Sequence, residues 1–161
     1  MSKTTTDICI IGGGPVGLFA AFECGLLKMK VDIVDTLDFV GGQCNALYPE
    51  KPIYDIPAFP AIDAGDLIKN LKAQADLFKP TYHLGQQVVA VQKTEEGDFN
   101  IKTSKGNEIN AKVIIIAAGC GAFGPNRPPI EGLEAFEGTG AVQYLIRTKE
   151  DYRNKKVVIA G

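Results

Sequence analysis

The sequence lacks a long apolar segment, an excess of basic residues and a hydrophobic leader. No apolar run approaches the roughly 20 residues that a helix needs to cross a bilayer, and residues 1–6 lack the apolar core of a secretion signal. Lysine and arginine number 17 against 19 acidic residues, and the net charge is −2. No positive surplus is therefore available to neutralise nucleic-acid phosphates. We expect a cytoplasmic protein that binds neither membranes nor nucleic acid.

Cysteines are few and far apart in the sequence. The four residues are Cys9, Cys24, Cys44 and Cys120, and no two form a Cys-x-x-Cys pair. A zinc knuckle or a redox dithiol is therefore not predicted, and no metal site is expected. Cys9 and Cys24 fall in apolar runs and Cys44 in a loop, where a free thiol usually packs as a small apolar group. We expect reduced thiols, as is usual in the cytoplasm.

The sequence contains a single histidine, His83. Histidine is a common general acid–base group near neutral pH, but no acidic residue or cysteine stands close to His83 in the sequence. A structural or surface role is favoured, and no catalytic side chain is predicted.

What the sequence does contain is a glycine-rich turn between an apolar run and a helical stretch. The run 8–11 leads into Gly12, Gly14 and Gly17, the spacing of a turn that holds a dinucleotide pyrophosphate against a helix N-terminus. Gly12 permits the tight turn, Gly14 leaves room for the pyrophosphate, and Gly17 lets the helix pack closely on the strand. Pro15 is tolerated in the first turn of that helix.

A second apolar run, 31–34, ends on Asp35, 18 residues after Gly17. A carboxylate at this place accepts hydrogen bonds from a ribose diol. Taken alone, Asp35 is also compatible with a solvated acid at a strand end or with a turn-forming residue. The order of strand, glycines, helix, strand and acid favours a dinucleotide site over an ordinary strand–helix turn.

Apolar periodicity and turn residues predict the remaining elements. Strands are expected over 7–11, 31–34, 87–93, 99–103, 108–110 and 113–117, and helices over 15–27 and 64–78, the second capped by Asp63. The runs from 87 to 110 indicate an antiparallel meander, and 113–117 is typical of a parallel strand covered on both faces. The segment 36–60 has no periodicity, and so long a loop in a compact protein is usually functional.

The last forty residues differ in character from the rest. Three prolines in 124–131 indicate a linker, and 155–161 repeats the opening pattern of charge, apolar strand and glycine. We therefore expect two units: residues 1–122 as a dinucleotide-binding domain, and 123–161 as a linker with the start of a second nucleotide domain. On this interpretation the chain is a fragment of a two-domain protein.

Together these features resemble the two-domain flavin reductases built like thioredoxin reductase, and most of all the thioredoxin-reductase-like ferredoxin–NADP reductases of bacteria. The resemblance covers essentially all 161 residues. It is carried by Ile11–Phe19, Gly41–Gln43, Leu47–Lys51, Ile53–Ile56 and Ala118–Phe123. It implies an α/β fold, in which a Rossmann-like FAD-binding domain with a central parallel sheet is interrupted by a β-meander crossover.

The resemblance also implies roles for single residues around FAD. Asp35 would hold the adenosine ribose, and Gln43 would hydrogen-bond the flavin side of the cofactor. Tyr48 would lie against the isoalloxazine, Val88 would meet the adenine through its backbone, and Phe123 would border the cofactor. Read without the resemblance, Gln43 is an ordinary polar loop residue, Tyr48 packs a loop, and Val88 and Phe123 belong to a core. Gly12, Gly14, Pro15 and Gly17 complete the expected cofactor-binding set.

The activity implied by the resemblance is transfer of electrons from NADPH through FAD to ferredoxin or flavodoxin by a homodimer. NADPH would bind mainly outside this chain, and the 161-residue piece alone is expected to be inactive and to retain FAD weakly or not at all. The reaction would need no side-chain nucleophile, because the protein would position the two ring systems and adjust the flavin through hydrogen bonds and stacking.

Three other functions stay open at this stage. The first is reduction of a disulfide or a small molecule; alignment with thioredoxin reductase places its dithiol at 144–147, where this sequence has no cysteine. The second is a non-enzymatic FAD-binding module. The third is a simple NAD-dependent dehydrogenase, which the loop 41–56 and the meander disfavour.

Overall fold

Six strands form one sheet in a computed structural model that describes residues 3–122, 124, 127–144, 146 and 148–160. The spatial order is β5-β2-β1-β8-β7-β6. The four strands at one side, β5, β2, β1 and β8, run parallel, and β7 and β6 continue from β8 as antiparallel neighbours. The strands are β1 (Lys3–Ile11), β2 (Val31–Val34), β5 (Thr81–His83), β6 (Val88–Lys93), β7 (Phe99–Thr103) and β8 (Glu108–Ile116).

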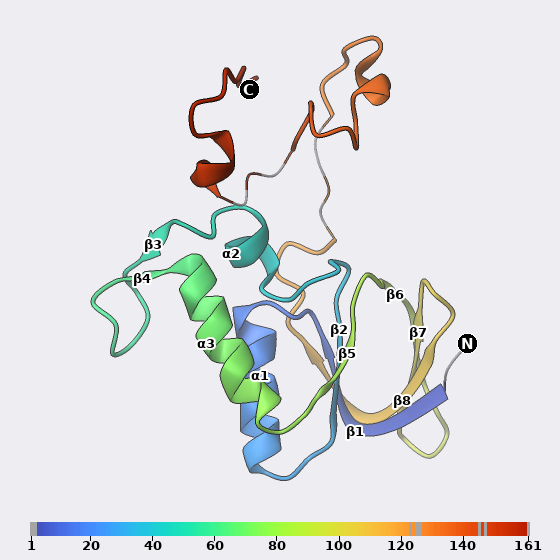
Figure 1. Ribbon diagram of the computed structural model, residues 1–161. Helices are drawn as coiled ribbons and strands as arrows, with labels where there is room; N and C mark the ends of the chain where they lie inside the picture. The colour runs from blue at the N-terminus through green and yellow to red at the C-terminus, as the bar shows by residue number, and fades with distance from the viewer. Residues whose placement is uncertain (1–2, 123, 125–126, 145, 147, 161) are drawn as a thin grey trace.

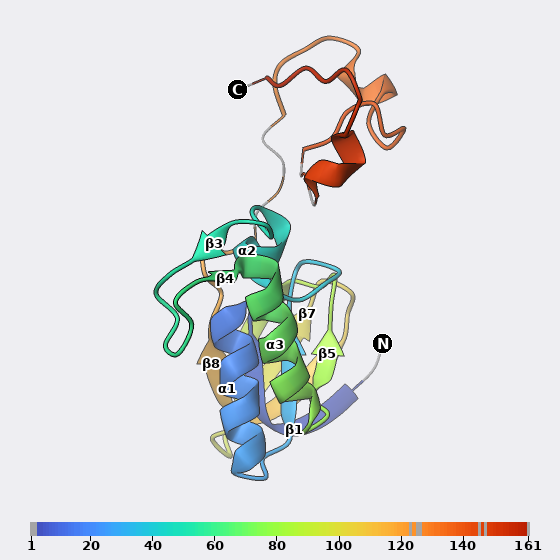
Figure 2. The ribbon, with the colours of Figure 1, turned by 60° about the vertical axis from the view of Figure 1, so that its left-hand side comes forward.

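Two helices cover one face of the parallel strands (Figures 1 and 2). They are α1 (Pro15–Leu26) and α3 (Ala64–Asp76), and Figure 2 shows them side by side in front of the sheet. Their apolar faces meet β1 and β2 in one core cluster that includes Ile10, Leu18 and Ile33, each fully buried. Burial of such stripes stabilises both layers. On the opposite face β6 and β7 curve over a second cluster, built around Ile101 and Ile109.

The central elements agree with the sequence-based expectation, including the parallel sheet and the antiparallel meander. The predicted division of 108–117 was wrong: residues 108–110 and 113–117 are not two strands but one, β8, which pairs with β1 from Lys3–Glu108 to Ile11–Ile116. β1 likewise begins at Lys3, four residues before the expected start. The polar run Thr4–Thr6 conceals this extension because it has no apolar alternation, although β-branched threonine suits a strand.

The expected double coverage of 113–117 is also contradicted. Val113, on the face that carries the helices, is 48% exposed because α1 and α3 lie mainly over β1, β2 and β5. Ile116, on the opposite face, is 77% exposed. The apolar strand expected within 155–161 is absent from the described part of that segment, 155–160. A strand needs a hydrogen-bonding neighbour, and no described segment pairs with these residues.

The segment 36–60 holds a short helix, α2 (Gly42–Ala46), and β3 (Pro52–Ile53), which pairs with β4 (Ile62–Asp63). Asp63 occupies the N-cap position of α3, but its side chain makes no cap hydrogen bond, contrary to expectation. The carbonyls of Lys51 and Pro49 instead accept from the amides of Ala64 and Gly65. The loop thereby satisfies amides that the helix leaves unpaired.

The described residues beyond β8 contain two short 3₁₀ helices, η1 (Leu133–Ala135) and η2 (Lys149–Tyr152). They lie beyond the carboxyl end of the parallel strands (Figure 1). The Thr148 hydroxyl donates to Glu50 Oε1 at 3.0 Å, and Lys149 lies 3.8 Å from the same carboxylate. The division at 122/123 stays a prediction. Among the described residues, no helix is both long and apolar enough to span a membrane.

Candidate functional site

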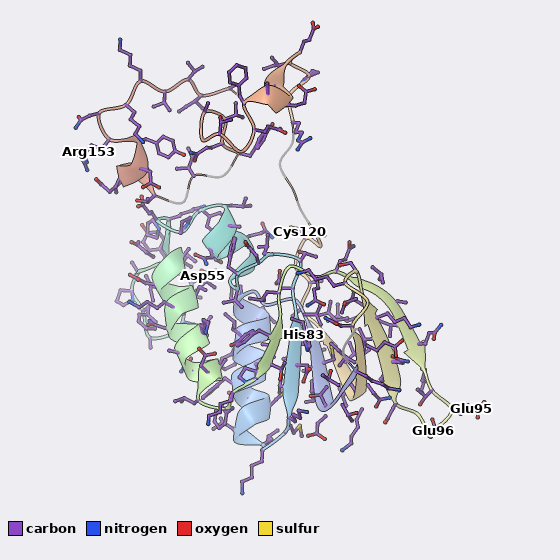
Figure 3. The ribbon with its side chains drawn as sticks, turned by 45° about the vertical axis from the view of Figure 1, so that its right-hand side comes forward. Asp55, His83, Glu95, Glu96, Cys120 and Arg153 are labelled. Atoms are coloured by element: carbon purple, nitrogen blue, oxygen red, sulfur yellow. The ribbon has the colours of Figure 1, made fainter. Side chains whose placement is uncertain are left out.

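A cleft of about 660 Å³ opens where the parallel strands end. In the sheet, β1 lies between β2 and β8, and a crevice at this point is where ligands bind to open α/β sheets. Figure 3 shows Cys120 at this end of the sheet. The lining comes from the β1–α1 turn, the end of β2, α2 with the loop after it, the start of β6 and the segment after β8.

The glycines of the β1–α1 turn have different structural roles. Gly12 has a φ of 109°, and a Cβ there would collide with the carbonyl of Ala117. A Cβ on Gly17 would collide with the carbonyl oxygen of Gly12. Gly14 differs, because a Cβ there would meet only Gly42 Cα, at an ordinary 4.0 Å. The fold thus requires Gly12 and Gly17, whereas Gly14 leaves space that opens into the cleft.

Helix α1 begins at this turn with Pro15 in its first turn, and its N-cap, Gly14, has no side chain to cap the helix. The free amides and the positive end of the helix dipole therefore face the cleft side of the turn, an arrangement that favours an anion. Gly12, Gly14 and Pro15 line the cleft, whereas Gly17 lies behind the turn, outside the cleft lining.

Asp35 lines the cleft and is 9% exposed. Its Oδ2 accepts from the Gly13 amide at 2.6 Å, and its Oδ1 accepts from the Leu37 amide at 2.9 Å. The carboxylate therefore holds the glycine turn to the end of β2. Each oxygen keeps a further lone pair, so a ribose hydroxyl can still donate to it. Sequence reasoning anticipated the ribose contact but not this second duty.

Helix α2 and the loop after it supply the opposite side of the cleft, with Gln43, Cys44 and Tyr48. Burial first, and then the neighbouring Cys44 thiol, raise the pKa of Tyr48. Lys51 Nζ lies 5.5 Å from the centre of the Tyr48 ring, within cation–π range. Cys44 also packs against the main core cluster, as its packing role predicted.

Val88 both lines the cleft and packs against the second core cluster, so its two predicted environments coexist. Phe123 lies outside the described residues. The cleft thus brings together every described residue of the predicted cofactor set except Gly17. The members that line it are Gly12, Gly14, Pro15, Asp35, Gln43, Tyr48 and Val88.

Sequence reasoning missed Gln86, which also lines the cleft. Its side-chain oxygen accepts hydrogen bonds from Thr103 and Asn107, and its backbone amide donates to the Asp35 carbonyl at 2.9 Å. Thr103 and Asn107 stand 17 and 21 residues away from Gln86. A glutamine just before a strand carries no local signal for such partners.

His83 has an acidic partner that its sequence neighbourhood does not show. Its Nε2 lies 2.8 Å from Asp32 Oδ2 on β2, and both side chains are buried. Figure 3 shows His83 within the sheet, apart from Cys120 at the cleft end. Neither His83 nor Asp32 lines the cleft. Burial, and then the charge of Asp32, raise the pKa of the neighbouring Cys9 thiol to about 12, so this group of residues is structural.

Comparisons with known proteins agree with this geometry. The sequence profile of the pyridine nucleotide-disulphide oxidoreductases matches residues 6–161. A protein of Paramagnetospirillum magneticum named ferredoxin–NADP reductase is 56% identical over 161 residues, which cover 100% of this chain and 48% of the relative. Another of that name from Acidiphilium cryptum is 59% identical over 162 residues, with the same two coverages. The chain thus spans about half the length of these curated relatives.

The fold is also that of a solved thioredoxin reductase from Streptococcus pyogenes. The TM-score is 0.63 at 22% identity, and the match covers 82% of this chain and 40% of that one.

Proposed function

The chain belongs to the pyridine nucleotide-disulphide oxidoreductase family, and from that premise we propose that it is the FAD-binding part of a ferredoxin–NADP reductase. The observation that carries the proposal is identity of 56% to a protein of that name across all 161 residues. The cleft supports it, because seven of the nine predicted FAD contacts line one crevice at the end of the parallel strands.

The residues present fit FAD. The space at Gly14 and the uncapped start of α1 suit a pyrophosphate, and the fixed carboxylate of Asp35 suits a ribose diol. Val88 would meet the adenine through its backbone. On the far side, Gln43 would hydrogen-bond the flavin, and Tyr48, whose ring already has Lys51 within cation–π range, would stack on the isoalloxazine. Phe123 would border the cofactor.

Bound FAD supplies the chemistry of accepting a hydride and releasing electrons one at a time. The described side chains need only place and hold the cofactor, and we assign none of them a catalytic step. NADPH as donor, ferredoxin or flavodoxin as acceptor, a homodimeric state and a cytoplasmic location belong to the same proposal. The NADPH site would lie mainly in the remainder of the longer protein, and a second unit would begin near residue 123.

Disulfide reduction is the nearest competing function. It requires a pair of thiols that take electrons from the flavin and exchange with the substrate. The segment 144–147, where alignment places that pair, contains no cysteine. Cys44 and Cys120 line the cleft from separate segments.

The test uses the full-length protein. We expect purified protein to show flavin absorption bands and to catalyse NADPH-driven reduction of ferredoxin but not of a thioredoxin disulfide. Absence of flavin after reconstitution with FAD would remove the cofactor from the proposal. Reduction of thioredoxin in place of ferredoxin would favour the competing function.

A further inference from the structure

Gln86 sits between β5 and β6 with only 8% of its surface exposed. Its side-chain oxygen accepts two hydrogen bonds, from the Thr103 hydroxyl at 2.7 Å and from Asn107 Nδ2 at 2.8 Å. A buried carboxamide whose oxygen has two donors is held in one orientation. Gln86 is therefore a fixed group on the cleft wall.

The hydrogen-bond pattern of Thr103 determines which end of the Gln86 carboxamide faces it. The Thr103 hydroxyl oxygen accepts from the Asn107 backbone amide at 3.2 Å. Thr103 is 3% exposed, so its own hydrogen needs a buried acceptor, and Gln86 Oε1 provides it. The nitrogen end of the carboxamide is consequently turned away from Thr103.

That nitrogen end has no acceptor in the described part of the chain, and it is not sealed from solvent. Gln86 lines the cleft, and because its oxygen end is engaged by Thr103 and Asn107, we infer that the N–H groups face the cleft. The position along the cleft is set by the backbone: the Gln86 amide donates to the Asp35 carbonyl at 2.9 Å. Val88, the predicted adenine contact, is two residues further on.

We propose that Gln86 is an adenosine-recognition residue, whose carboxamide N–H₂ donates a hydrogen bond to a ring nitrogen or ribose oxygen of the bound dinucleotide. Thr103 and Asn107 are its positioning residues, because they hold the oxygen end. The inference rests on the proposed FAD site and adds a side-chain donor to it. The alternative is that Gln86 only braces the turn between β7 and β8.

The substitution Gln86→Glu separates the two roles. A carboxylate can still accept from Thr103 and Asn107, so the brace survives, but the donor is lost and a negative oxygen faces the ligand. The matched control is Gln92→Glu, the same change at an exposed position on the edge strand β6. Both variants are made in the full-length protein and stripped of flavin. Each is then titrated with FAD, and separately with ADP as a competitor, because ADP has the adenosine half of the cofactor but no flavin.

For Gln86→Glu we expect at least about tenfold weaker binding of both FAD and ADP. The flavin spectrum at saturating FAD and the melting temperature of the apoprotein should not change. Gln92→Glu should match wild type. Wild-type affinity for both ligands in Gln86→Glu would overturn the proposal and leave the bracing role, and so would a loss for FAD without one for ADP.

Failure of Gln86 and failure of the site itself give different results. If wild-type apoprotein does not bind FAD, the proposed function fails; if it binds FAD and Gln86→Glu binds it equally well, only the role of Gln86 fails. Should Gln86→Glu not fold, Gln86→Met keeps the packing volume and lacks the donor. The same comparison of FAD and ADP then decides.

Discussion

At the scale of single residues, one turn contains glycines of two kinds. Gly12 and Gly17 are required by the protein itself, since a Cβ at either position collides with backbone. Gly14 has ordinary space around it and opens into the cleft. A motif read from sequence treats the three alike, but their substitution should have opposite effects on stability and on binding.

Replacing Gly17 by alanine should destabilise the apoprotein by about 3 kcal/mol or more, because the Cβ meets a backbone oxygen that cannot move away. Gly14→Ala should leave the melting temperature nearly unchanged and weaken FAD binding about tenfold or more. Thermal melts of the apoprotein and FAD titrations measure the two effects. Unchanged FAD affinity in Gly14→Ala would show that the pyrophosphate does not approach this turn.

Some residue roles could be predicted and others could not. The position of Asp35 at the cleft followed from its spacing after the glycines, because that spacing is set by one strand–helix–strand unit. The hydrogen bonds that its carboxylate accepts from the Gly13 and Leu37 amides could not be predicted, because they depend on how the turn folds back. Gln86 was missed for the related reason that its partners arrive from a distant hairpin.

At the scale of elements, local signals located most strands and helices, but long-range pairing fixed their ends. Lys112 interrupts the apolar pattern, and the sequence-based prediction therefore divided β8 into two strands. In the structure, pairing with β1 makes the strand continuous. The start of α3 is held by carbonyls of Pro49 and Lys51 rather than by the side chain of Asp63. Neither fact is encoded within the element concerned.

The link between β2 and β5 gives a test at this scale. Removing His83 leaves the buried Asp32 carboxylate with only a 3.4 Å hydrogen bond from the Thr4 hydroxyl to Oδ2, and Oδ1 already has no partner among the described residues. We expect His83→Ala to lower the free energy of unfolding by about 3–5 kcal/mol. The double variant Asp32→Ala/His83→Ala should lose clearly less than the sum of the two single variants.

Urea denaturation of the four proteins in this cycle gives the coupling energy. The protein is studied as apoprotein, so that cofactor binding does not add to stability. Additive losses would mean that Asp32 and His83 contribute independently and that the contact between them has no net energetic role.

At the scale of the whole molecule, one face of the sheet carries exposed apolar side chains. Phe19 on α1 and Val113 on β8 lie on the side of the sheet that carries the helices, and each is 48% exposed. Apolar surface that is not covered tends to recruit a partner. This face explains why the prediction of a doubly covered strand over 113–117 was wrong. An apolar run indicates that a strand is hydrophobic, but it does not indicate which elements pack on it.

The 161-residue chain should therefore self-associate in a concentration-dependent manner. We expect Val113→Lys to reduce that association, because a lysine keeps its stem on the sheet and adds a charge to the face. Gln92→Lys, which adds the same charge at an exposed position of β6, should not reduce it. Sedimentation velocity at several concentrations checks both variants, and a monomeric wild-type chain at every concentration would contradict the prediction.

The bonds around Asp35 have a consequence for how the site is loaded. Its carboxylate accepts hydrogen bonds from the backbone amides of Gly13 and Leu37, and its carbonyl accepts one from the backbone amide of Gln86. The wall on this side is therefore preorganised, and little conformational entropy remains to be lost when a ligand arrives. When protein stripped of flavin is reconstituted with FAD, the backbone of this wall should therefore keep the conformation that it has in the apoprotein.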